Sequence, residues 1–250
     1  MSSPDLTRIW DTFQFCGELD MLECRLRTTA AYVHKWVILE STQTHQGQPR
    51  APSVLSGPRW DPWADGIIQV VARPRGCDPW TREEAQRDAA TADILAATAP
   101  LDLILHSDVD EIPDLARIHD RQPPFALTMT QFVFAADWLS REHEPFTVCE
   151  YAGDLKSLSL LRARRGVLPR VHAGAHLSWF GGPAAIEEKA ARCGHAATVA
   201  PQVKAAQGTM WEDGFVPWDG IYLRHTTHHP DWPQWVMDHR CPDVWWSPRA

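Results

Sequence analysis

Four acidic residues, Asp108, Asp110, Glu111 and Asp114, follow a short apolar segment near the middle of the chain. Carboxylates are costly to bury unless they are paired or bound to a cation. In an extended segment, residues i and i+2 point the same way, so Asp108 and Asp110 can converge on one ion while Val109 faces the core. Their oxygens suit Mg²⁺ or Mn²⁺, ions that keep positions open for substrate phosphates. The spacing therefore indicates a metal site, with a solvated acidic turn as the alternative.

The carboxylates need elements that hold them in place, and short apolar segments provide these. Segment 101–105 has leucine and isoleucine at alternate positions and predicts a buried strand leading to the acidic cluster. Segments 9–16, 35–41 and 67–72 predict three earlier strands. The spacing of leucines in 18–26 predicts a helix between the first two strands.

A second helix is expected to begin near Thr81, which would serve as N-cap with Glu84 three residues on. Segment 57–66, which is rich in Gly, Pro and Trp, is expected to be a loop. The order strand–helix–strand–strand–helix–strand predicts a mostly parallel sheet. In such sheets the ligand crevice lies at the carboxyl ends of the strands, where the acidic cluster stands.

The second half of the chain is less regular. Segments 125–135 and 158–162 predict strands, and 174–182 predicts a short strand that ends in a glycine pair. Segment 184–193 predicts a helix. The sequence shows no internal repeat and no linker.

The totals favour one soluble α/β domain. We expect it to span residues 1–230, with a Trp- and Pro-rich tail, residues 231–250, packed on it. A net charge of −8 argues against a nucleic-acid partner bound through a broad basic surface. No apolar run approaches the roughly 18–20 residues of a membrane span. The six cysteines form no C-x-x-C pair, so reduced thiols and a cytoplasmic location are expected.

Several motifs occur in an order that resembles one family, glycosyltransferase family 17, over about residues 8–198. They are Phe13-x-Phe15, Glu18-Leu-Asp-x-Leu-Glu-x-Arg-Leu26, Val37-Ile-Leu-Glu-Ser41 with Thr44 and Gly47, Glu83 to Arg87, Ser107-Asp-Val-Asp-Glu-Ile-Pro113, Gly174-x-His-Leu-Ser178, Lys189 and His195. The resemblance implies a GT-A type, Rossmann-like fold with a mostly parallel or mixed sheet. It also implies a nucleotide-sugar donor, Mn²⁺ or Mg²⁺, and inversion at the anomeric carbon. Characteristic members use UDP-N-acetylglucosamine and modify the core mannose of N-glycans, so a carbohydrate or other hydroxyl acceptor is expected.

The resemblance also suggests further metal and catalytic residues. GT-A enzymes often take a third metal ligand, frequently a histidine, from the C-terminal half, and His176, His195 and His225 are the candidates. Inversion requires a base that takes the proton of the attacking hydroxyl. Glu187 and Glu188 follow a glycine pair and open a helix, which would direct one of them to the site. Structural histidines and ordinary helix capping are the alternatives.

Donor-binding residues are expected where the first two strands end. The candidates are Glu18, Asp20 and Arg25 after the first strand, and Glu40, Ser41 and Thr44 at the end of the second. Asp108 would reach the donor through the metal. Arg87 could contact the diphosphate, although an i, i+4 pair with Glu83 explains it equally well.

Aromatic residues are abundant, with 13 tryptophans. Trp138 and Trp179 are candidate platforms for the acceptor, with core packing as the alternative. Two other functions remain open. A haloacid-dehalogenase-type phosphohydrolase also uses D-x-D, but normally after its first strand, whereas here the motif follows about the fourth. A non-catalytic sugar-binding protein would bind sugar without metal-dependent turnover.

Overall fold

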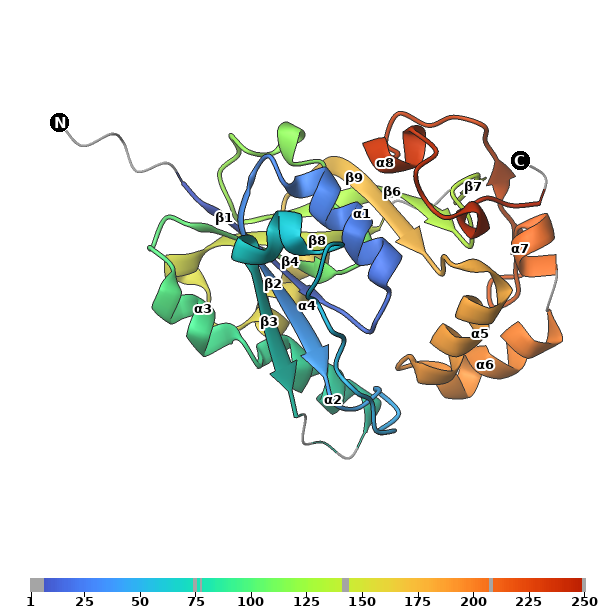
Figure 1. Ribbon diagram of the computed structural model, residues 1–250, viewed down its shortest axis with the longest axis horizontal. Coiled ribbons are helices and arrows are strands. Elements are labelled where there is room, and N and C mark those ends of the chain that lie inside the picture. The colour runs from blue at the N-terminus through green and yellow to red at the C-terminus, as the bar shows by residue number, and fades with distance from the viewer. Residues whose placement is uncertain (1–6, 74–75, 77, 141–143, 207–208, 249–250) are drawn as a thin grey trace.

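The computed structural model describes residues 7–73, 76, 78–140, 144–206 and 209–248. These residues form a single α/β domain around a mixed, curled sheet with helices on both faces (Figure 1). The predicted fold class, a Rossmann-like sheet flanked by helices, is therefore confirmed.

The first half of the chain builds the parallel part of the sheet, as predicted. Its strands lie in the order β3-β2-β1-β4. Their bounds are Ile9–Gln14 for β1, Val33–Ser41 for β2, Ile67–Ala72 for β3 and Leu103–Asp108 for β4. The carboxyl ends of β1 and β4 are adjacent, because Gln14 is in register with Asp108.

The second half extends the sheet with antiparallel strands. Strand β8 pairs antiparallel with β4 and with β6. Strand β6 also pairs in parallel with β9, and β9 pairs antiparallel with the two-residue strand β5. Strands β7 and β12 form the far edge, and β10 and β11 form a separate hairpin. The bounds are Glu111–Ile112 (β5), Phe125–Val133 (β6), Trp138–Leu139 (β7), Pro145–Tyr151 (β8), Arg170–Ser178 (β9), Phe215–Val216 (β10), Ile221–Tyr222 (β11) and Arg224–His225 (β12).

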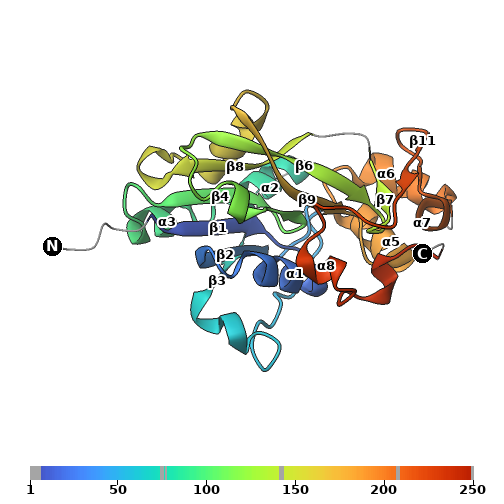
Figure 2. The same cartoon turned by 90° about the horizontal axis from the view of Figure 1, so that it is seen from above.

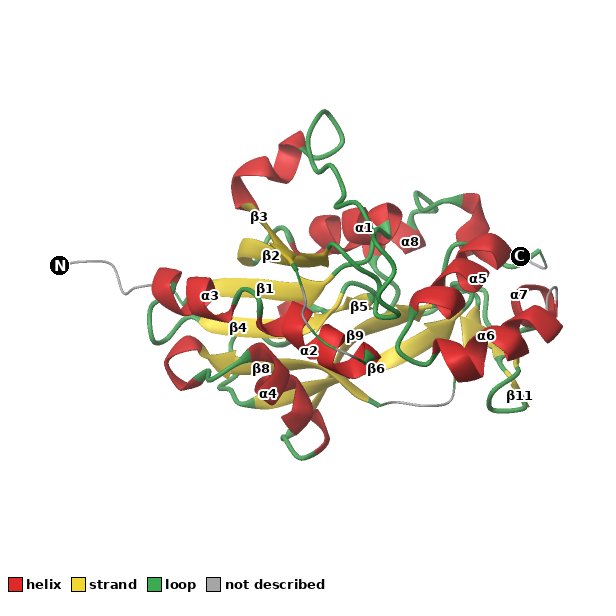
Figure 3. Cartoon of the chain, turned by 90° about the horizontal axis from the view of Figure 1, so that it is seen from below, coloured by secondary structure: helices red, strands yellow, loops and turns green. Residues whose placement is uncertain are grey.

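Helices cover both faces of the sheet. Helices α1 and α8 lie on the face seen in Figure 2, and α2, α3 and α4 lie on the face seen in Figure 3. Helices α5, α6 and α7 gather beyond the end of β9 (Figure 1). The bounds are Leu19–Thr29 (α1), Pro79–Asp88 (α2), Thr91–Ala97 (α3), Leu158–Ala163 (α4), Gly182–Arg192 (α5), Ala196–Ala205 (α6), Thr209–Asp213 (α7) and Gln234–Met237 (α8). Short 3-10 helices occur at Asp61–Gly66, Leu115–Arg117, Ala152–Asp154, Arg164–Gly166 and Asp243–Trp245.

The two faces have separate apolar cores because side chains alternate along each strand. On β1, Phe13 packs toward α1, whereas Trp10 packs toward the opposite helices. The C-terminal segment completes the first of these cores. Trp232 and Trp245 are buried in the same cluster as Phe13, and the Trp232 indole donates to the Ala136 carbonyl (2.9 Å).

Three local predictions were wrong. The segment 158–162, predicted as a strand, belongs to helix α4, whose N-cap is the Ser157 hydroxyl. Helix α2 is capped by Asp78, which accepts from the backbone of Trp80 and Thr81, so Thr81 is not its N-cap. Strand β4 begins two residues later and ends three residues later than predicted, so Asp108 is its last residue.

No helix among the described residues is long and apolar enough to cross a membrane. The five cysteines that the structure describes are free thiols. The sixth, Cys77, lies outside the described residues.

Candidate active site

Asp108 ends β4 between two arginines that come from the helices behind the sheet. Its carboxylate lies 3.2 Å from Nη2 of Arg87 in α2 and 3.1 Å from Nη2 of Arg162 in α4. Burial by itself raises the pKa of the Asp108 carboxyl, but the guanidinium groups of Arg162 and Arg87 lower it to about 2. Both arginines have a second carboxylate partner, Glu83 for Arg87 and Glu111 for Arg162. The result is an alternating network of charges with Asp108 at its solvent-facing edge.

Asp110, two residues on, faces a different cation. Its Oδ2 lies 2.7 Å from Nζ of Lys189 in α5, and its Oδ1 lies 3.7 Å from Nε2 of His176 in β9. Burial raises the pKa of this carboxyl, yet Lys189 and His176 hold it well below its usual range. Val109 between the two aspartates is buried in the core, as predicted.

The loop that carries both aspartates is fixed from within by Arg25 of α1, which is fully buried. Its guanidinium donates to both oxygens of Asp11 (2.9 and 2.6 Å) and to the Ser107 hydroxyl (2.6 Å). It also donates to the backbone carbonyls of Asp108 (3.0 Å) and Glu111 (2.7 Å). Arg25, predicted as a donor-binding residue, thus has its charge directed into the protein, where it positions the acidic loop.

A close crossing of two strands fixes the other side of the loop. Strand β5 pairs with β9, and the backbone N–H of Leu177 donates to the Asp110 carbonyl (2.8 Å). Gly174 of β9 has φ of +110°, and a Cβ there would lie 2.2 Å from the Ile112 carbonyl oxygen. Only glycine allows this approach, because any side chain would separate the two strands.

The residues at the end of β2 shape the neighbouring segment. The buried Glu40 carboxylate accepts from Arg50 (2.5 Å), from the Ser53 backbone (3.0 Å) and from the Ser53 hydroxyl (2.8 Å). The hydroxyls of Ser41 and Thr44 accept from backbone N–H groups two and four residues on, each at 3.1 Å. These three candidates for donor binding therefore order segment 42–53 beside the site.

Glu18 and Asp20 lie on different sides of the start of α1. The half-buried Glu18 accepts from the Cys16 backbone (2.9 Å). Burial lowers the pKa of Lys189, whereas the charges of Asp110 and then Glu18 raise it, with a net upward shift. Asp20 is exposed and pairs with Arg59 at 2.5 Å. Glu18 is thus the member of this pair that the structure brings to the cluster.

The three candidate histidines are spread over the structure, and only His176 lies at the acidic cluster. The His195 ring packs edge-on against Trp80, with centroids 4.8 Å apart. His225 in β12 lies 3.1 Å from Asp137. Both contacts account for these histidines without a metal.

Helix α5 directs Lys189, rather than its glutamates, to the cluster. Glu187 and Glu188 lie on the exposed side of this helix, and Glu188 pairs with Arg192 one turn on. Neither carboxylate contacts Asp108 or Asp110. Lys189 belongs to the motifs that carry the resemblance, but no role was predicted for it. Arg162 was not predicted as a site residue because its helix was predicted as a strand.

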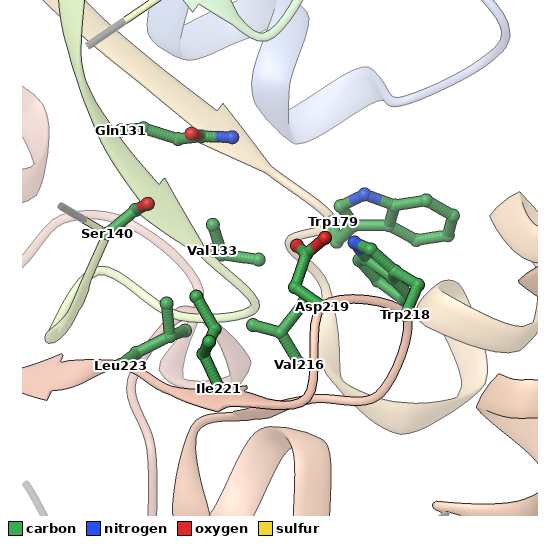
Figure 4. Close-up of a pocket in the computed structure, with 9 residues that line it drawn as sticks. All are labelled: Gln131, Val133, Ser140, Trp179, Val216, Trp218, Asp219, Ile221 and Leu223. Atoms are coloured by element: carbon green, nitrogen blue, oxygen red, sulfur yellow. The ribbon is translucent and has the colours of Figure 1, made fainter. Parts of the chain in front are cut away.

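The two candidate tryptophans have different surroundings. Trp138 is 3% exposed, and its indole donates to the Trp211 carbonyl (2.9 Å), so it is part of the core. Trp179 is partly exposed and lines a pocket with Trp218, shown in Figure 4. Its ring also lies 5.5 Å from Nζ of Lys189.

The donor set limits how a metal could bind. In the part of the chain that the structure describes, no three His, Cys, Asp or Glu side chains are arranged to hold one ion. Asp108 and Asp110 are a pair of hard oxygen donors, and the Asp108 side chain is 37% exposed. Two carboxylates fit Mg²⁺ or Mn²⁺ if the remaining ligands come from water and substrate phosphates.

The arrangement combines these carboxylates with three cations at the carboxyl ends of adjacent strands, a composition that suits a charged phosphate ligand. No curated protein matches the chain. The sequence model of glycosyltransferase family 17 matches residues 1–179, a span that includes the whole acidic loop and Arg25. Since this match covers well over half of the 250 residues, the chain belongs to glycosyltransferase family 17.

Proposed function

We propose that this glycosyltransferase is metal-dependent and inverting, and that it transfers N-acetylglucosamine from UDP-N-acetylglucosamine to a hydroxyl of a glycan or another acceptor. The observation that carries the proposal is the position of Asp108 and Asp110 at the carboxyl end of β4, each beside basic side chains. Such a site offers oxygen ligands to a cation and basic groups to a diphosphate in the same place.

Asp108 and Asp110 are the residues that would hold Mn²⁺ or Mg²⁺. The ion, when bound, would neutralise charge on the departing diphosphate. Arg87 and Arg162 fix the orientation of the Asp108 carboxylate from behind, leaving its open side to the solvent. Lys189 pairs with Asp110, and a metal ion bound in place of its ammonium would keep that carboxylate compensated. In that case the Lys189 ammonium would be available to a phosphate oxygen.

The uridine preference rests on a carboxylate that accepts from the uracil N3–H. Glu18 and Glu40 are the two candidate carboxylates. Glu40 already accepts hydrogen bonds from Arg50 and Ser53, so Glu18 is the candidate acceptor for uracil. Loss of one charge-assisted hydrogen bond costs on the order of 1.5–3 kcal/mol, which is tenfold or more in affinity. Calorimetry should therefore rank UDP and TDP above CDP, because cytosine lacks that N–H, and Glu18→Gln should remove most of this difference. We also expect UDP to bind more tightly than GDP.

A nucleotide-sugar panel tests the whole proposal. We expect slow release of UDP from UDP-N-acetylglucosamine that requires Mn²⁺ or Mg²⁺ and is lost in Asp108→Asn and Asp110→Asn. Asp93→Asn, an exposed substitution in α3, is the matched control and should behave like the parent. Metal-independent release would contradict the metal assignment, and a preference for GDP-sugars would contradict the donor assignment. Phosphate release from monoesters would instead support a phosphohydrolase.

A further inference from the structure

A pocket lies where the strands β6 and β9 end against the β10–β11 hairpin (Figure 4). It holds about 370 Å³ of space, part of which is open to solvent. Its wall combines two indole rings with three polar side chains and an apolar floor. The residues are Trp179, Trp218, Gln131, Ser140, Asp219, Val133, Val216, Ile221 and Leu223.

The two indoles form one aromatic wall. The rings of Trp179 and Trp218 lie 5.2 Å apart at 39°, and Trp218 is held from behind by an edge contact with Phe134. Trp179 has φ of +63°, a left-handed conformation that is unfavourable for a bulky residue. Such strained residues concentrate at ligand clamps.

Two routes connect the pocket to the acidic cluster. The first runs through Trp179, because Nζ of Lys189 lies 5.5 Å from its ring and 2.7 Å from Asp110. The second runs across the sheet. Gln131 of β6 is in register with His176 of β9, and His176 faces Asp110 at 3.7 Å. The pocket is therefore linked to the proposed metal-binding carboxylates through residues that contact one another, Trp179 and Lys189.

Asp219 supplies an exposed carboxylate to this pocket. It lies in the turn between β10 and β11, where the backbone N–H groups of Asp219 and Gly220 both donate to the Val216 carbonyl. Figure 4 shows its carboxylate directed toward the two indole rings. Neither glutamate in α5 has a comparable position, since both lie on the exposed side of that helix.

We propose that this pocket is the acceptor subsite, in which a sugar ring packs on Trp179 and Trp218 and presents a hydroxyl to Asp219. This inference rests on the proposed transferase function. Flat indole faces pack against the apolar face of a sugar ring, and carboxylate, amide and hydroxyl groups orient its hydroxyls. The hydroxyl oxygen forms a bond to the anomeric carbon while the bond from that carbon to the diphosphate oxygen breaks. The bonding electrons leave with the diphosphate, and the hydroxyl proton passes to the Asp219 carboxylate.

Ligand-observed NMR with methyl glycosides of mannose, glucose and N-acetylglucosamine tests the subsite directly, with and without UDP and Mn²⁺. We expect Trp218→Ala to weaken glycoside binding about tenfold, in line with the loss of one aromatic contact. Tyr222→Ala is the matched control, because this exposed aromatic residue lies in the same hairpin and does not line the pocket. Unchanged glycoside binding in Trp218→Ala would overturn the subsite.

Transfer rates test the role of Asp219. Asp219→Asn should bind glycosides within about threefold of the parent but transfer sugar about 10²–10⁴ times more slowly, the usual contribution of a general base. Asp219→Glu should recover part of the rate. Full-rate transfer by Asp219→Asn would overturn the assignment. Calorimetry with UDP separates this inference from the proposed function. The parent protein could bind and hydrolyse the donor while the pocket variants bind glycosides as the parent does. That result would support the proposed function and contradict only the acceptor subsite.

Discussion

Replacement of Arg25 by methionine should destabilise the protein strongly, although this residue lies beneath the site and has no solvent exposure. Methionine has a similar reach but no charge, so Asp11 is left buried without its ionic partner. Loss of one member of a buried ion pair costs about 3–5 kcal/mol. Unfolding entropy is about 2.1 cal/mol/K per residue, which for this chain gives about 0.5 kcal/mol/K. The expected decrease in Tm is therefore about 6–10 °C.

Differential scanning fluorimetry on the purified protein measures this change, and Arg27→Met is the matched control. Arg27 lies in the same helix and pairs with Glu23, but its side chain is 44% exposed. Exposed pairs of this kind contribute about 0.3–0.5 kcal/mol, so Tm should fall by about 1 °C.

A double variant separates loss of the ion pair from loss of packing. Arg25→Met combined with Asp11→Leu removes the unpaired charge and should recover a substantial part of the loss. The interpretation would be refuted if Arg25→Met cost no more stability than Arg27→Met.

Three further changes have defined outcomes. Because the pKa of Asp108 is lowered to about 2 and that of Asp110 is lowered further, these carboxylates stabilise the fold above the unfolded-state pKa of about 4. The urea concentration at the midpoint of unfolding should thus decline as pH falls from about 5 toward 2. This decline should be weaker in Asp108→Asn, and equal declines in the two proteins would contradict the pairing of Asp108 with Arg87 and Arg162. Lys189→Met removes the cation that occupies Asp110, so Mn²⁺ should bind more tightly by calorimetry, and weaker binding would show that Lys189 does not compete with the metal. Gly174→Ala places a methyl group against the Ile112 carbonyl and should lower the Tm by several degrees, and an unchanged Tm would show that the β5–β9 crossing can widen freely.

The parallel half of the fold could be predicted because its strands are short apolar segments separated by one clear helix and turn-forming residues. The position of Asp108 and Asp110 at the carboxyl end of β4 could be predicted, because an apolar segment leads directly to them. Helix α4 could not be predicted, because its six residues form too few turns for a helical pattern to be distinguished from a strand pattern. Arg162 was therefore not predicted as a site residue. Ser157, the N-cap residue of α4, is the sequence signal that could have indicated the helix.

The partners of charged side chains were the least predictable part of the site. Glu40 lies near the end of β2 and Arg25 lies in α1 after β1, yet both side chains are directed inward to other residues. Their partners, Ser53 and Asp11, lie at sequence separations that no local pattern connects. Lys189 reaches Asp110 from a helix 79 residues away, so only the tertiary structure reveals that pair.

The burial of Trp232 and Trp245 against α1 has a consequence for the order in which the chain can fold. Helix α1 is synthesised about 200 residues before Trp232 and Trp245, which belong to the same apolar core. A nascent chain therefore exposes the part of this core that Trp232 and Trp245 cover until those residues have been synthesised. Contacts of such high sequence separation close slowly, because a long loop must be ordered first. We therefore expect this exposed part of the core to be a place where incomplete chains associate with one another or bind chaperones.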